Sequence, residues 1–153
     1  MKTSLHRRLF LKHAAVTAGA LATVPSLPNI LRAASSPDKL NCVLIGCGWR
    51  GGQHLEEVVA THQQNLVAIV DPSETQQAVV KKWLQGRQIP ADKLQVFADY
   101  RVMFDKIGKQ VDAVFIATPN HQHAVPALMA MKLGKHVYCE KPVSHNVAEA
   151  RRL

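Results

Sequence analysis

The chain has 153 residues, 47% of them hydrophobic, which suits one globular domain with a hydrophobic core. Its net charge of +8 is uneven: residues 1–33 carry five basic and no acidic side chains, and the remaining 120 residues contribute only +3. Because most of the chain has an ordinary surface charge, the composition argues against nucleic acid as a partner.

The first residues have the pattern of an export signal. A basic segment precedes an apolar stretch of eleven residues, 14–24, which is too short to span a bilayer as a helix. His6–Lys12 resembles the twin-arginine signal S/T-R-R-x-F-L-K, with His6 in place of the first Ser or Thr. Cleavage is expected after Ala33 or Ala34. We therefore predict export to the periplasm by the twin-arginine machinery, and an uncleaved signal that tethers the protein to the membrane remains an alternative.

The next segment, Leu40–Gly52, joins an apolar strand to a glycine-rich turn. The strand ends at Gly46, and Gly46, Gly48 and Gly51 have the spacing G-x-G-x-x-G. In a dinucleotide-binding turn these glycines allow a tight bend, a close approach of pyrophosphate, and packing of the next helix on the strand. An ordinary glycine-rich turn would show the same triplet. We expect the helix over residues 53–62, with its N-terminal amides binding the phosphates.

A second apolar strand, Leu66–Val70, ends in Asp71 and Pro72. Asp71 lies 25 positions beyond Gly46, where an acidic residue in such a domain binds a ribose 2′-hydroxyl and repels the 2′-phosphate of NADP. The sequence therefore predicts NAD in preference to NADP, with both residues at the cofactor.

Strands and helices alternate to the end of the chain. Helices are predicted over residues 73–85, from Asp99, over 121–133 and over 144–153 with Ser144 as the N-cap, and strands over 94–97, 111–117 and 136–139. The helical side chains expected to face the core are Ala78, Val79, Leu84, Val102, Met103, Ile107, Val125, Leu128, Met129 and Leu133. Because the strand over 111–117 is apolar on both faces, we predict an α/β fold with a doubly wound parallel sheet (a Rossmann fold), which binds its ligand at the carboxyl ends of the strands.

Polar residues follow the last two predicted strands. They are Thr118, Pro119, Asn120, His121 and His123 after one strand, and Glu140, Lys141 and Pro142 after the other. Lys141 is placed to steer a hydroxyl or carbonyl, with Glu140 holding it, although a solvated Glu–Lys pair would have the same spacing. The two histidines are half of a metal site without further ligands, so no metal is predicted. The remaining histidines, His54 among them, are assigned surface or packing roles.

The three cysteines are expected to be free and mostly buried thiols. Cys42 and Cys47 are five positions apart on one extended segment, beyond the reach of a disulfide, and Cys139 is expected two strands away.

These motifs together carry a resemblance over residues 40–153. Leu40–Gly52, Asp71-Pro72, the segment 117–123 and the segment 134–142 are similar to the N-terminal half of the glucose-fructose oxidoreductase, inositol dehydrogenase and MocA family (Gfo/Idh/MocA). Glu140-Lys141-Pro142 is the most specific of the motifs. The sequence is accordingly divided into a signal peptide, a linker and a truncated NAD(P)-binding domain, over residues 1–34, 35–39 and 40–153.

The resemblance implies roles for individual residues. Lys141 matches the lysine beside nicotinamide and substrate, and Glu140 and Pro142 match residues that position it. Thr118, Asn120 and His123 match the loop against the nicotinamide half, with Pro119 between them. Trp49 and Arg50 match the turn over the pyrophosphate. The resemblance also implies a second α/β domain, absent from this chain, which supplies the substrate pocket and the interface of a homo-oligomer.

Three functions remain open from the sequence. The leading one is an exported, NAD-dependent oxidoreductase that transfers a hydride to or from a sugar, polyol or related carbohydrate. The second is an NAD-dependent glycosidase that oxidises its substrate transiently. The third is a nucleotide-binding fragment without catalysis, which would describe these 153 residues by themselves.

Overall fold

A computed structural model describes residues 39–59 and 64–153. The predicted signal peptide, residues 35–38 of the predicted linker and the end of the first predicted helix lie outside the described residues. The strands are β1 (Asn41–Ile45), β2 (Asn65–Val70), β3 (Gln95–Phe97), β4 (Ala113–Ile116) and β5 (His136–Cys139). The α-helices are α3 (Trp49–His54), α4 (Glu74–Gly86), α5 (Tyr100–Ile107), α6 (Ala124–Lys132) and α7 (Val147–Ala150). A π-helical turn covers Leu55–Val59, and 3-10 turns cover Gly108–Gln110 and Asn120–Gln122.

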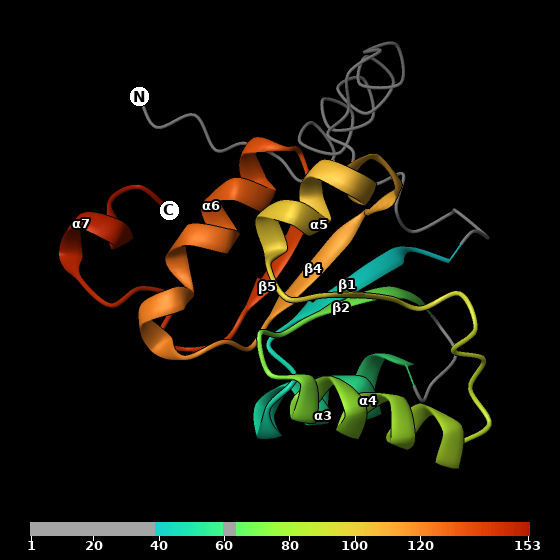
Figure 1. The fold of residues 1–153 in the computed structure, drawn as a ribbon. Coiled ribbons are helices and arrows are strands. Elements are labelled where there is room, and N and C mark those ends of the chain that lie inside the picture. The colour runs from blue at the N-terminus through green and yellow to red at the C-terminus, as the bar shows by residue number, and fades with distance from the viewer. Residues whose placement is uncertain (1–38, 60–63) are drawn as a thin grey trace, which may run out of the picture. The chain divides into compact units, whose positions relative to one another are not determined.

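The five strands form one parallel sheet in the order β3-β2-β1-β4-β5. The chain winds outward from β1 to one edge through β2 and β3, then crosses to the other edge through β4 and β5 (Figure 1). The predicted doubly wound sheet is therefore confirmed. Because every strand runs the same way, the carboxyl ends of β1, β2, β4 and β5 lie side by side. We call this side of the sheet, across the strand ends, its carboxyl edge.

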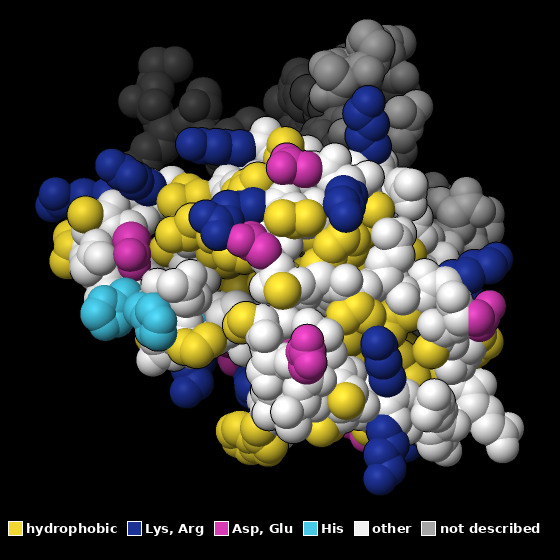
Figure 2. Space-filling model, in the orientation of Figure 1, with side chains coloured by type: hydrophobic (Ala, Val, Ile, Leu, Met, Phe, Trp, Pro, Cys, Tyr) yellow, Lys and Arg dark blue, Asp and Glu magenta, His cyan; other side chains and the backbone are white. Residues whose placement is uncertain are grey.

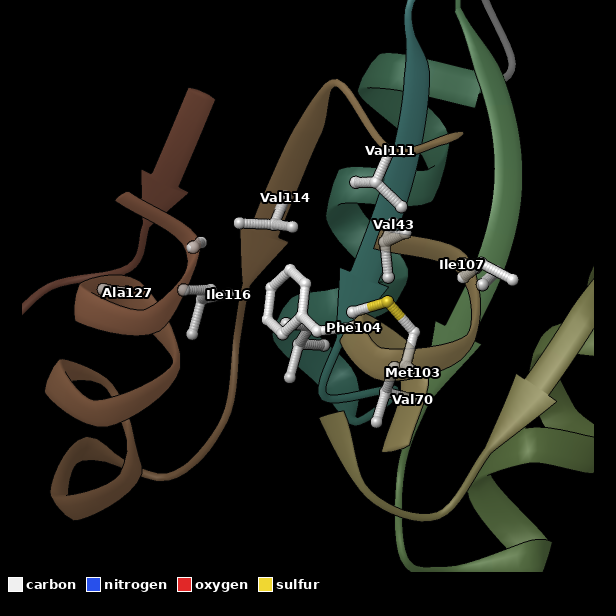
Figure 3. Packing of buried hydrophobic residues seen from close by; sticks show 12 residues of the cluster. Val43, Val70, Met103, Phe104, Ile107, Val111, Val114, Ile116 and Ala127 are labelled. Carbon is white, nitrogen blue, oxygen red and sulfur yellow. The ribbon is translucent and has the colours of Figure 1, made fainter. Parts of the chain in front are cut away.

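Helices cover both faces of the sheet. Figure 1 shows α3 and α4 on one side and α5 and α6 on the other. Successive β1 side chains point to opposite faces of the sheet. Val43 and Ile45 pack with α5 and α6 on one face, and Leu44 packs with α4 on the other. Figure 3 shows Met103 and Phe104 of α5 beside Val43 in the first of these cores. The central strand is thus buried on both faces, as its apolar sequence predicts.

The inward face of α6 differs from the prediction. Val125 is 51% exposed and Leu133 is also exposed, while Leu128 and Met129 are half-buried. The buried residues of α6 are Ala124, Pro126, Ala127 and Ala130. Because this helix is apolar nearly all round, its hydrophobic periodicity does not identify a face, and the small side chains let it lie close to the sheet.

In two other helices the predicted buried face is partly wrong. In α4, the predicted Leu84 is buried, but Ala78 and Val79 are exposed and Val80 is buried in their place. In α5, Val102 is exposed and Phe104 is buried beside the correctly predicted Met103 and Ile107.

Several helix ends also differ from the prediction. The first helix begins at Trp49, directly after the glycine turn, and α6 begins at Ala124 after a 3-10 turn. The last helix, α7, is capped by Asn146 instead of Ser144, because the Asn146 side chain accepts a hydrogen bond from the Glu149 N–H at 2.9 Å. The predicted caps Ser73 and Asp99 are confirmed.

The surface of the described residues carries mixed charge. On the face drawn in Figure 2, Lys and Arg side chains are interspersed with acidic and hydrophobic ones and do not gather into one basic patch. Among the residues that the structure describes, no helix is both long and apolar enough to cross a membrane.

The cysteines are free thiols, as predicted, and β4 separates the strands of Cys42 and Cys139. Burial, with a smaller effect of Asp112, raises the pKa of Cys42 to about 11. Burial raises the pKa of Cys47 to about 12 and that of Cys139 to about 11, with smaller effects from nearby carboxylates.

We expect these thiols to react slowly with an aromatic disulfide reagent at pH 8. A pKa raised from 9.0 to about 11 leaves about 100-fold less thiolate at Cys42 and Cys139, a pKa of about 12 leaves still less at Cys47, and the thiolate is the reactive form. Native and guanidinium-unfolded protein should therefore differ about 100-fold or more in the rate of thiol release, measured by absorbance. Equal rates in the two states would contradict the burial seen here.

Candidate active site

The glycine turn leaves no room for a side chain at two of its three glycines. Gly46 has φ +94°, and a Cβ there would lie 2.6 Å from the carbonyl of Ala117 at the end of β4. A Cβ on Gly51 would lie 2.1 Å from the carbonyl oxygen of Gly46. These two glycines are therefore required by the packing of the turn against β4 and of α3 against the turn.

Gly48 has no such packing requirement. It is the N-cap of α3 with an ordinary φ of −68°, and a Cβ there would meet no protein atom within 4 Å. Among the described residues, no side chain accepts a capping hydrogen bond from the first N–H groups of α3. Open space and uncapped backbone amides at the start of a helix suit an anion.

Asp71 joins the turn after β1 to the turn after β2. Its Oδ2 accepts a hydrogen bond from the Cys47 N–H at 2.8 Å, and its Oδ1 accepts one from the Ser73 N–H at 2.8 Å. Each carboxylate oxygen can accept a second hydrogen bond, so the side chain can still bind a ribose hydroxyl. The structure thus gives Asp71 a structural role beside the predicted one.

Two adjoining cavities lie along the carboxyl edge of the sheet. The larger, about 760 Å³, is lined by residues that include Gly46, Gly48, Asp71, Pro72, Pro119 and Tyr100. The smaller, about 350 Å³, is lined by Trp49, Arg50, Ala117, Thr118, Asn120, His123, Glu140 and Lys141. Ala117 and Thr118 line both cavities, which therefore adjoin at these residues, between Asp71 in the larger cavity and Lys141 in the smaller.

Thr118 carries a polar atom that suits a ligand. Its Oγ1 is buried and has no hydrogen-bond partner among the described residues, at the point shared by the two cavities. A buried hydroxyl without a partner is unfavourable unless something binds to it. Together with the open space at Gly48, it fits a dinucleotide held along this edge.

Glu140 is a buried carboxylate with two side-chain partners on α3. It is 6% exposed, and its Oε1 lies 2.9 Å from Nε of Arg50 and 2.9 Å from Nε2 of His54. The Arg50 guanidinium beside it holds the pKa of Glu140 below its usual range, so this carboxyl is ionised at neutral pH. The alternative of a solvated Glu–Lys pair is wrong, because the partner of Glu140 is Arg50 and not Lys141.

Arg50 has its contacts away from the glycine turn. It reaches Glu140 at the end of β5 and Gln53 one turn along α3. Trp49, which precedes it, is 81% exposed at the rim of the smaller cavity. The predicted roles of these residues over a pyrophosphate remain predictions.

His123 holds two loops of the site together. Its ring is buried, with Nε2 at 2.7 Å from the Thr118 carbonyl oxygen and Nδ1 at 2.7 Å from the Pro142 carbonyl oxygen. Both ring nitrogens therefore face the backbone, and a direct polar contact to a cofactor would require one of these contacts to break. No group of three or more candidate metal ligands occurs among residues 39–59 and 64–153.

The structure also shows a site residue that the sequence did not identify. His54, predicted to have a surface or packing role, is 3% exposed and lies against Glu140. Its spacing of four positions from Arg50 is a usable signal, because residues i and i+4 share a face once α3 is known to begin at Trp49.

Comparison with known proteins gives a family match over most of the chain. Residues 40–153 match the family model GFO_IDH_MocA, described as an oxidoreductase family with an NAD-binding Rossmann fold. The myo-inositol 2-dehydrogenase of Lactobacillus plantarum has a similar structure, with a TM-score of 0.64 and 27% identity over 75% of this chain and 32% of that protein.

Several curated relatives come from Shewanella, and two of them illustrate the match. The "Glycosyl hydrolase family 109 protein 1" of Shewanella sp. (strain ANA-3) is 33% identical over 98% of this chain and 36% of its own length. The "Alpha-N-acetylgalactosaminidase" of Shewanella oneidensis is 33% identical over 95% of this chain and 35% of its own length. The chain thus spans about a third of the length of these relatives.

Proposed function

The chain belongs to the Gfo/Idh/MocA family of oxidoreductases with an NAD-binding Rossmann fold, and from this we propose that the full-length protein is an exported, NAD-dependent enzyme that transfers a hydride to or from a carbohydrate hydroxyl carbon. The observation that carries the proposal is that Lys141 lines the cavity that continues the cofactor path from Asp71 through Thr118.

Each part of the site then has a task. Asp71 binds the adenosine ribose, the amides at Gly48 bind the pyrophosphate, and Thr118 Oγ1 hydrogen-bonds to the nicotinamide half. Bound NAD supplies the hydride acceptor. Lys141 donates a hydrogen bond to the substrate hydroxyl oxygen and stabilises the negative charge that develops there as the carbon is oxidised. The hydroxyl proton is proposed to pass to a base from the second domain that the resemblance implies.

Export rests on the first residues. We propose the twin-arginine route because Arg7-Arg8 is followed by Phe10, Leu11 and Lys12 at the required spacing. A protein exported in the folded state can take up NAD before it leaves the cytoplasm. The substrate pocket and the homo-oligomer interface are proposed to come from the second domain that the resemblance implies.

The second candidate function is NAD-dependent glycoside cleavage, in which transient oxidation is followed by elimination, addition of water and return of the hydride. It is supported by the two Shewanella relatives, whose likeness covers 98% and 95% of this chain and so extends beyond the family model's residues 40–153. An enzyme that regenerates its own NAD would need no free cofactor in the periplasm.

One assay separates the two candidates. Purified full-length protein would be incubated with sugars, polyols and aryl glycosides, once without and once with added NAD, and followed for aglycone release and for NADH absorbance. Release of aglycone without NADH supports the glycosidase, and NADH formation that depends on added NAD supports the dehydrogenase. Absence of both activities across a panel of sugars, polyols and glycosides would contradict the proposal.

The choice of cofactor leads to a prediction about Asp71. Asp71→Ala should weaken NAD binding about tenfold or more and NADP binding much less, because the 2′-hydroxyl loses its acceptor while the 2′-phosphate loses a repelling charge. Isothermal titration with both cofactors measures this.

Asp112→Ala is the matched control for that experiment. The Asp112 carboxylate also accepts a backbone N–H, from Asn41 at 2.8 Å, but it lies at the start of the strands, away from both cavities. It should lower stability without changing the NAD to NADP ratio. An unchanged ratio in Asp71→Ala would mean that the 2′-hydroxyl is bound elsewhere.

A further inference from the structure

His54 is a buried imidazole in the core beside the proposed site. It is the last residue of α3, and its ring lies 5.1 Å from the ring of Tyr138 and 5.9 Å from that of Phe115. A Phe or Leu would fill such a slot between two aromatic rings. A polar ring in this position requires a partner, because an unpaired polar group in the interior is unfavourable.

The partner of His54 is the carboxylate that precedes Lys141. His54 Nε2 and Arg50 Nε each lie 2.9 Å from Oε1 of Glu140. His54 Nδ1 faces Glu57 at the longer distance of 3.9 Å. One helix thus brings two nitrogen atoms to ion-pair distance of a single carboxylate oxygen on another element, in close contacts that lack hydrogen-bond geometry.

Arg50 and His54 differ in their exposure to solvent. The Arg50 side chain is partly open to water, whereas that of His54 is enclosed. A solvent-exposed ion pair is weak and mobile, so Arg50 supplies charge but limited positional restraint. The enclosed imidazole, which is packed against two rings, restrains the carboxylate in one position.

Glu140 transmits this restraint to Lys141. Glu140 directly precedes Lys141 in the chain, and after Arg50 and His54 the backbone N–H of Lys141 also helps to lower the pKa of Glu140. On the other side of the lysine, the Pro142 carbonyl oxygen lies 2.7 Å from His123 Nδ1. The two neighbours of Lys141 in the chain thus each contact a buried histidine, and one of these, His54, is on the helix that starts at the proposed pyrophosphate site.

We infer that His54 is a positioning residue for Lys141, acting through the Glu140 carboxylate. The inference rests on the role proposed for Lys141 in hydride transfer. It adds that α3 connects the phosphate-binding turn at its first residue to the reacting lysine at its last.

The test replaces the imidazole but keeps the packing. In His54→Phe, the amide of Lys141 should exchange with solvent about tenfold faster or more, as measured by NMR hydrogen exchange on this chain. In the full-length enzyme, kcat should fall about tenfold with the KM for NAD within about threefold. His54→Gln, whose amide N–H can replace the imidazole Nε2–H, should restore both quantities to within about threefold of wild type.

His136→Phe is the matched control, since it makes the same change at an exposed histidine on β5 that lines neither cavity. It should change neither quantity. If His54→Phe does not fold, His54→Asn replaces it, because its shorter amide does not reach Glu140, and the same acceleration of exchange is expected.

Unchanged exchange at Lys141 in the folded variant would overturn the inference whatever the enzyme's reaction, because exchange is measured without substrate. Faster exchange with unchanged kcat would overturn the role of His54 in the reaction. Glu140→Gln completes a double-mutant cycle with His54→Phe. If His54 acts through Glu140, the Lys141 amide in the double variant should exchange no faster than in the more affected single variant. Additive effects would overturn the proposed link.

Discussion

Lys141→Ala in the full-length enzyme is expected to reduce turnover by about 100-fold or more while NAD affinity stays within about threefold. The lysine lines the smaller cavity beside Thr118 and Glu140, whereas the groups proposed to bind adenosine and pyrophosphate line the larger one. Its removal takes away the group proposed to stabilise charge on the substrate oxygen and leaves the rest of the cofactor path intact.

The measurement pairs steady-state kinetics with isothermal titration of NAD. Lys132→Ala, at an exposed position on α6 outside both cavities, is the control for loss of a positive charge. It should keep wild-type turnover. If Lys141→Ala turned over at the wild-type rate, Lys141 would have no part in the reaction.

Gly51→Ala is expected to lower the stability of the fold, whereas Gly48→Ala is expected to weaken NAD binding. The added Cβ at Gly51 would lie 2.1 Å from the Gly46 carbonyl oxygen, so α3 must move away from the turn. We expect a loss of about 3 kcal/mol or more in the free energy of unfolding, a large part of the stability of a small domain.

Gly48→Ala should leave stability within about 1 kcal/mol of wild type, because its Cβ meets no protein atom within 4 Å. It should weaken NAD binding tenfold or more, about 1.4 kcal/mol, because the methyl group fills space that the pyrophosphate needs. The two substitutions therefore separate the role of a glycine in the fold from its role in binding.

Urea unfolding and NAD titration of both variants provide the comparison. Tight NAD binding by Gly48→Ala would show that the cofactor does not approach this turn. A Gly51→Ala variant as stable as wild type would show that α3 can leave the turn without loss.

The sequence was sufficient for the features that depend on local order along the chain. The alternation of apolar strands with polar-capped helices determines a parallel, doubly wound sheet, since right-handed crossovers leave few other arrangements. The positive φ at Gly46 and the caps at Ser73 and Asp99 follow from side-chain chemistry within a few positions. The NAD-binding family follows from the glycine spacing and the residues at the strand ends.

The sequence was insufficient to identify the buried face of a helix that has several apolar sides. Val125 and Val79 are apolar residues at helical spacing, but the sheet selects Ala127 and Val80 for burial. Hydrophobic periodicity records that an apolar face exists, whereas the angle at which a helix meets the sheet decides which residues belong to it.

The tertiary structure alone decided how Lys141 is held. His54 and Glu140 are 86 positions apart in the chain, and no local pattern connects them. They meet because α3 begins at the carboxyl end of β1 and its last residue packs on the sheet against Phe115 of β4 and Tyr138 of β5, beside the residue that follows β5. The sequence predicted which residues carry the chemistry, since residue type follows from the chain itself. Their hydrogen-bond partners depend on contacts between distant segments, which exist only after the chain has folded.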